Sequence, residues 1–167
     1  MAGRKTLWYQ RYRTATYLNA IVWIAWTVAI LLPFAPFSYL QPIIVGGGAG
    51  TWFLVAYLLF PAVAIGGFAV ISSLTFVIEA YERRRLNYAV MLTGFILLYG
   101  GLLVGCLLLG IAGASGGYAL VIQPSAVNAA QNVLSPYPDP ITAASSIAVA
   151  GTVITIYGMA SAKATKP

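Results

Sequence analysis

The chain has 167 residues, of which 60% are hydrophobic and 7% are charged, and its mean hydropathy is +0.87. Soluble domains carry charge on about a quarter of their residues, so this composition excludes a soluble fold and indicates an integral membrane protein. The net charge of +6 comes from a few basic residues beside apolar runs, so we assign it to membrane orientation and expect no nucleic-acid partner. The absence of histidine and the single cysteine, Cys106, exclude His-ligated metal or haem sites and an internal disulfide.

Four apolar segments predict an all-α integral membrane protein, a single domain over residues 1–167 with four transmembrane helices. The spans are expected at about residues 17–34, 51–79, 87–112 and 141–162. The apolar part of the first is longer than that of a typical signal peptide, so we expect a retained span. The second is long and contains Pro61 and Gly66–Gly67, which predicts a tilted or kinked helix, with two half-spans as the alternative.

The basic residues predict the topology. All nine fall before the first span, between the second and third, or after the fourth: Arg4, Lys5, Arg11, Arg13, Arg83, Arg84, Arg85, Lys163 and Lys166. Cytoplasmic segments carry an excess of Lys and Arg, so both termini are expected to be cytoplasmic, with Arg83, Arg84 and Arg85 as topology anchors. Trp8 and Trp52 are the expected aromatic anchors at the two interfaces. The segment around Trp8 should lie at the inner headgroups, either as simple anchoring or as a short amphipathic surface helix.

Glu79 stands at the end of the second span, four residues before Arg83. This spacing places two side chains on one helical face, so it predicts a local ion pair with a structural role. The alternative is a proton or cation relay, because ionisable groups within spans often mark transport paths. Glu79 is therefore the candidate functional side chain of the sequence.

Small residues recur on one face of the third and fourth spans: Gly94, Gly101, Gly105 and Ala112, then Ala144, Ala148, Gly151, Thr155 and Gly158. Helices in lipid associate through close backbone contact over small side chains, so each stripe predicts a packing seam. The neighbouring helix belongs either to the same chain or to a partner. Tyr57 and Tyr99 fall within spans, where each hydroxyl is expected to bond another helix; a redox or quinone-facing role is the alternative.

The two outer loops, at about residues 35–50 and 113–140, are almost without charge. The second is long for an unstructured connection, so we expect it to be partly structured. The expected elements are a strand at 119–122 and a short helix starting at Pro124 or Ser125. Asp139 and Pro140 are expected to be the N-cap and first residue of the fourth span.

The sequence lacks the groups that catalysis requires. Without histidine there is no Ser-His-Asp or Cys-His arrangement, and no phosphate-binding loop, dinucleotide fingerprint or metal-ligand cluster occurs. We expect no catalytic or metal site and no side-chain-ligated cofactor, leaving contact with lipid or quinone. These features favour a non-catalytic accessory subunit, bound to other integral membrane subunits and the bilayer, of a respiratory or other energy-converting assembly in a prokaryotic plasma membrane. The alternative is a small homo-oligomeric transporter or channel for a small solute.

Overall fold

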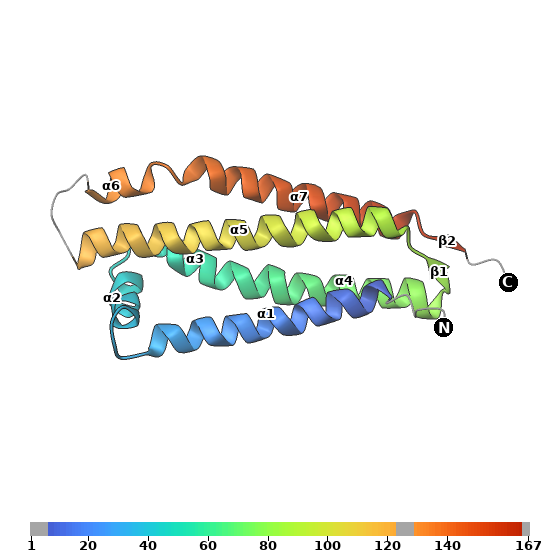
Figure 1. Ribbon diagram of the computed structural model, residues 1–167, viewed down its shortest axis with the longest axis horizontal. Helices are drawn as coiled ribbons and strands as arrows, with labels where there is room; N and C mark the ends of the chain where they lie inside the picture. The colour runs from blue at the N-terminus through green and yellow to red at the C-terminus, as the bar shows by residue number, and fades with distance from the viewer. Residues whose placement is uncertain (1–6, 123–128, 165–167) are drawn as a thin grey trace.

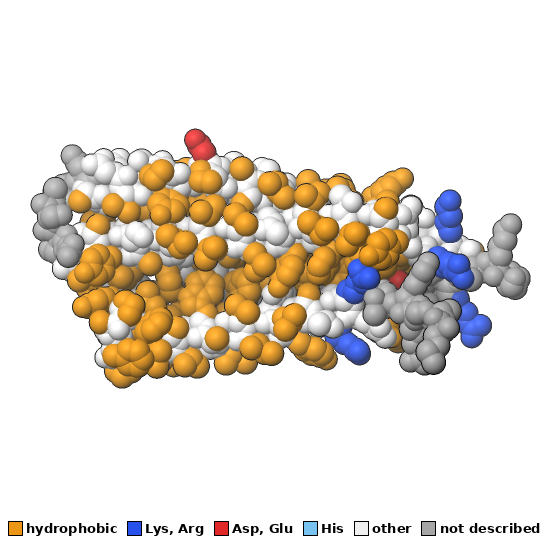
Figure 2. All heavy atoms as spheres, viewed as in Figure 1, with side chains coloured by type: hydrophobic (Ala, Val, Ile, Leu, Met, Phe, Trp, Pro, Cys, Tyr) orange, Lys and Arg blue, Asp and Glu red, His pale blue; other side chains and the backbone are white. Residues whose placement is uncertain are grey.

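The computed structural model describes residues 7–122 and 129–164. Of these residues 84% are helical, which confirms the all-α class. Four segments are long and apolar enough to cross a membrane: Trp8–Leu31, Gly50–Tyr81, Tyr88–Val121 and Ala129–Ala160. Apolar side chains cover the middle of the visible face, and Lys and Arg side chains gather at the end where the first helix begins (Figure 2). This distribution matches the surroundings of a protein embedded in a bilayer.

The described elements follow one another in a simple order. The first span and the connection after it contain helix α1 (Trp8–Leu31), a 3-10 turn η1 (Phe37–Tyr39) and helix α2 (Leu40–Val45). The second span contains α3 (Gly50–Phe60), the π-helix η2 (Pro61–Gly67), α4 (Phe68–Phe76) and the π-helix η3 (Val77–Tyr81). The rest comprises strand β1 (Arg84–Arg85), α5 (Tyr88–Val121), α6 (Ala129–Leu134), α7 (Pro138–Ala160) and strand β2 (Lys163–Ala164).

Helix α5 lies between the other spans (Figure 1). It packs against α7 on one side and against α3 on another, while α1 lies against α4 and η2. Strands β1 and β2 lie at the end of the bundle where α1 begins and α7 ends, and helices α2 and α6 lie at the other end (Figure 1). The two strands pair antiparallel, so they tie the turn after the second span to the segment after α7.

An aromatic cluster forms the core at the end where α1 begins. Tyr12 is fully buried, and its ring centroid lies 5.6 Å from that of Phe68 on α4 and 5.2 Å from that of Phe95 on α5. Trp8 is only 3% exposed and also packs against Phe95. Tilted and edge-to-face ring pairs are each worth about 0.5–1.5 kcal/mol beyond the burial of their area. The cluster therefore fixes the start of α1 against two other spans.

The first helix begins before the predicted start of the first span, near residue 17. Helix α1 begins at Trp8 and runs without a break to Leu31, so the described part of the basic segment belongs to the same helix as the first span. Trp8, the first residue of α1, lies in the aromatic cluster. Its role as an interface anchor stays a prediction. The basic segment resembles a surface helix in sequence because its charges and aromatic residues alternate. However, Trp8 and Tyr12 are buried against α4 and α5, and Tyr9 is partly buried.

The third helix likewise extends beyond the predicted end of the third span, near residue 112, because α5 continues to Val121. The additional turns are glycine-rich, and Cβ atoms added at Gly113 and Gly117 would collide with Phe53 and Ile43. These glycines let α5 approach α3 and α2 closely, which stabilises the helix beyond the expected boundary. Residues 119–121 are consequently helical, and the strand expected there is absent.

Three smaller predictions concern the remaining boundaries. The second span is helical throughout from Gly50 to Tyr81, so the alternative of two half-spans was wrong. The predicted starts of the short outer helix, Pro124 and Ser125, lie outside the described residues, which show helix α6 from Ala129. Helix α7 begins at Pro138, so Asp139 lies in its first turn and is not the N-cap. A carboxylate there still favours the helix through the macrodipole.

Candidate functional site

The small-residue stripes of α5 and α7 face each other. A Cβ added at Gly101 would lie 2.6 Å from both the carbonyl oxygen of Ala144 and the amide nitrogen of Ala148. A Cβ at Gly151 would collide with the backbone of Leu98. The contacted atoms belong to the main chain, so the two helices touch backbone to backbone. The partner of each predicted seam is therefore a helix of the same chain.

The contact continues along most of the stripe. Added Cβ atoms at Gly94 and Gly158 would meet Thr155 and Met91 respectively, the latter at 2.7 Å from the sulfur. At Gly105 the nearest atom would be the Cβ of Ala144 at 3.7 Å, an ordinary contact distance. Ala112 is fully buried as well. The small residues thus serve packing within the bundle.

A polar cluster in the middle of the bundle was missed at the sequence level. Asn19 of α1 is fully buried; its Nδ2 donates to the carbonyl oxygen of Ala64 at 2.9 Å, and its Oδ1 accepts from the Tyr99 hydroxyl at 2.8 Å. Ala64 belongs to the π-helix η2, where the regular backbone pattern changes. Asn19 therefore joins three spans. A lone asparagine within an apolar run, "YLNAIV", was the available signal.

The predicted interhelical bonds of the two tyrosines are confirmed. Tyr99 bonds Asn19, and the Tyr57 hydroxyl lies 2.9 Å from the Thr27 hydroxyl of α1. The Tyr12 hydroxyl similarly reaches Thr155 Oγ1 at 3.4 Å, so α1 also contacts the α5–α7 seam. Among the described residues the indole nitrogen of Trp23 is the exception, because it is buried without a hydrogen-bond partner. Most of the buried polar groups are thus used in holding the helices together.

Glu79 contacts the start of α1. Its Oε2 accepts the backbone N–H of Tyr9 at 3.2 Å, and Ser72 donates to the carbonyl oxygen of Tyr9 at 2.9 Å. The first N–H groups of a helix have no partner within that helix, and Leu7, the N-cap of α1, supplies no side-chain acceptor. Glu79 therefore caps α1 from another span and places a negative charge at the positive end of its dipole.

Glu79 and Arg83 were expected to lie one turn apart on the same helix, and the structure does not place them so. The helix ends at Tyr81, and Arg83 adopts a positive φ of 52°, so the two residues do not share a helical face. Arg84 instead pairs with Glu82 at 3.5 Å and donates to the carbonyl oxygen of Ala162. Arg84 thereby ties the turn after the second span to the residues after α7.

The remaining predicted anchors lie at the two ends. Arg85 is exposed and pairs through its backbone with Lys163. Trp52 is partly buried in the first turn of α3, at the end of the bundle opposite the arginines (Figure 1). This arrangement places basic groups at one end and an indole at the other.

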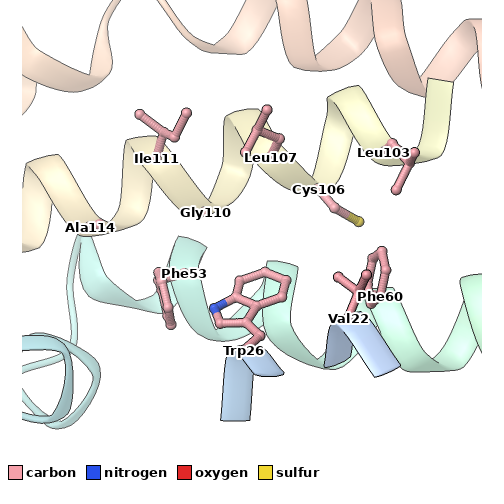
Figure 3. A pocket seen from close by; sticks show the side chains of 10 residues that line it. All are labelled: Val22, Trp26, Phe53, Phe60, Leu103, Cys106, Leu107, Gly110, Ile111 and Ala114. Carbon is pink, nitrogen blue, oxygen red and sulfur yellow. The ribbon is translucent and has the colours of Figure 1, made fainter. Parts of the chain in front are cut away.

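An apolar pocket of about 520 Å³ lies between α1, α3 and α5 (Figure 3). Trp26 of α1 packs edge-on against Phe53 of α3 and lies against Gly110 of α5. The Cys106 side chain points toward Phe60 (Figure 3). The lining contains no charged side chain. The pocket suits an apolar occupant, such as an acyl chain or a hydrophobic side chain of a neighbouring helix.

No group of residues that could hold a metal ion occurs within residues 7–122 and 129–164. Comparison with protein-family models, curated proteins and solved structures finds no match to this chain.

Proposed function

We propose that the protein is a non-catalytic accessory subunit of a larger membrane complex and binds its partner through the outer surface of its second span. That surface carries Ala62, Gly66, Ala69 and Ser73, spaced by four, three and four residues, and all four are exposed. A Cβ added at Gly66 would have only the carbonyl oxygen of Pro61 nearby, at 3.8 Å. We call these four residues the span-two stripe.

The span-two stripe differs from the seams of α5 and α7 in one respect. The seam glycines Gly94, Gly101 and Gly151 are covered by backbone of the facing helix, whereas no described residue covers the span-two stripe. Small residues let the backbone of another helix approach closely, and close packing is the main source of helix association in lipid. A helix of another membrane subunit is the occupant that this surface favours.

The wider setting is also part of the proposal. The positive-inside rule supports cytoplasmic termini, because Arg11, Arg13, the arginines of the β1 turn and Lys163 lie at one end of the bundle. The π-helix η2 is the place where the second span is proposed to bend. The proposed complex is a respiratory or other energy-converting assembly in a prokaryotic plasma membrane. Within it, the apolar pocket between α1, α3 and α5 of this chain would contact lipid, quinone or a neighbouring subunit.

The proposal can be tested by native mass spectrometry after mild detergent extraction from the protein's own membrane. The wild type should be recovered with larger chains at fixed stoichiometry. Ala69→Leu should release those chains while the protein stays folded, because the larger side chain separates the two helices. Val70→Leu is the matched control: Val70 is the next residue, is 59% exposed and lies outside the stripe. Recovery of the wild type as a monomer would contradict the proposal.

A small homo-oligomeric transporter or channel is the second candidate function. The π-helix η2 in the middle of a span favours it, since π-helical turns are frequent at functional sites. Against it stand the buried Asn19, Thr75 and Thr155, whose hydrogen bonds go to neighbouring protein groups. Recovery of a homo-oligomer that Ala69→Leu dissociates would favour this second function.

A further inference from the structure

A second pocket, of about 690 Å³, lies between the first turns of α1 and the facing part of α5. Its α1 wall changes in polarity along the helix: Gln10, Arg11, Arg13 and Thr14 come first, and Ala15 and Leu18 follow. The step from Gln10 to Leu18 corresponds to about 12 Å along a helix axis. Phe95 and Tyr99 of α5 form the opposite wall. The pocket therefore has a polar rim and an apolar interior at different depths of the membrane.

The arginines of the rim are held by aromatic rings. The Arg11 guanidinium lies 4.6 Å from the centre of the Trp8 ring and 5.2 Å from that of Tyr88, and the Arg13 guanidinium lies 5.9 Å from the centre of the Tyr9 ring. Contacts of this kind place a cation over a ring face and restrict its position. The lining includes no acidic side chain, so the rim is positively charged.

We propose that this pocket is a binding site for one anionic phospholipid of the adjoining leaflet. The phosphate lies at Arg11 and Arg13, and the upper part of an acyl chain lies along Leu18, Phe95 and Tyr99. Guanidinium groups form charge-assisted hydrogen bonds with phosphate, and basic pockets between transmembrane helices bind anionic head groups. A free phosphate would occupy only the rim, whereas the apolar continuation on α5 favours a lipid.

The test is a lipid titration of the full-length chain, delipidated in mild detergent and followed by native mass spectrometry. The probes are phosphatidylglycerol and phosphatidylcholine with the same acyl chains, and inorganic phosphate is the competitor. The wild type should retain one phosphatidylglycerol at concentrations where phosphatidylcholine does not bind, and millimolar phosphate should not displace it. Equal retention of the two lipids, or displacement by phosphate, would overturn the proposal.

Two double variants separate the site from a general effect of charge. Arg11→Gln with Arg13→Gln should weaken phosphatidylglycerol binding by about tenfold or more. Arg83→Gln with Arg85→Gln removes the same charge outside the pocket and should leave binding within about twofold of the wild type. An equal loss in both double variants would contradict the site.

A third variant keeps both arginines. Thr14 is exposed on the pocket wall, so Thr14→Trp should fill the space without removing charge or disturbing the aromatic cluster. Phosphatidylglycerol retention should fall as in the Arg11–Arg13 double variant. This variant decides the question if that double variant fails to fold, and unchanged retention in it would refute the pocket as the binding site.

Discussion

Replacing Gly101 by alanine tests the backbone contact between α5 and α7. The new Cβ would lie 2.6 Å from main-chain atoms of both Ala144 and Ala148, whereas ordinary contacts to a Cβ begin near 3.4 Å. Main-chain atoms cannot rotate away, so the helices must separate by several tenths of an ångström. Overpacking of this kind costs about 1–3 kcal/mol, and separation also weakens dispersion contacts along the seam. We therefore expect Gly101→Ala to lower the free energy of unfolding by about 2–3 kcal/mol.

The matched control is the preceding residue. Gly100 is exposed, and a Cβ added there would have no atom within 4 Å. Alanine favours a helix over glycine by up to about 1 kcal/mol, so Gly100→Ala should be neutral or stabilising. The stability of both variants is measured by thermal unfolding in detergent, with tryptophan fluorescence as the readout. At about 2–4 °C per kcal/mol for a chain of this size, Gly101→Ala should lower Tm by about 5–10 °C. Equal Tm values for the two variants would refute the close contact.

Three further predictions concern other contacts. Gly151→Leu should abolish recovery of folded protein in size-exclusion chromatography, while Val149→Leu, at a 63% exposed position, should be tolerated; equal tolerance would disprove the seam. Asn19→Leu removes the acceptor of the Tyr99 hydroxyl and should lower the free energy of unfolding, measured by thermal unfolding, by about 1–2 kcal/mol. Tyr99→Phe should lower it less, by about 0.6 kcal/mol. The reverse order would contradict the bonding pattern. Glu79→Gln keeps an oxygen acceptor for α1 and should leave stability nearly unchanged, whereas Glu79→Leu should lose about 1 kcal/mol. Loss of a proton-coupled activity in Glu79→Gln, with assembly intact, would instead assign Glu79 a relay role.

Several features could be predicted because lipid restricts the available structures. A spanning segment must satisfy its backbone hydrogen bonds internally, so long apolar runs in this chain predict helices. Buried hydroxyl groups require partners, which is why a bond from Tyr57 and from Tyr99 to another helix could be expected. Each of these conclusions depends on local composition and general solvation, and none needs knowledge of which helices are neighbours.

The candidate site could be predicted only in part. Glu79 was recognisable as an unusual carboxylate, but its acceptor role depends on the amide of Tyr9, 70 residues away in the chain. The expected partner, Arg83, was the local one, and the end of the helix at Tyr81 removes the spacing on which that expectation relied. Asn19 was missed because its significance comes from Ala64, a backbone acceptor on another span.

The sequence alone determined that the chain is an all-α membrane protein, approximately where its four spans lie, and that its basic residues fall outside the apolar core of each span. Those properties follow from the free energy of transferring side chains and backbone from water to lipid, which is set by each segment separately. Only the tertiary structure decided that α1 begins at Trp8, that α5 extends to Val121, and that the span-two stripe is left uncovered. These outcomes depend on contacts between distant segments, because in lipid the fit of one helix surface against another decides which faces are covered.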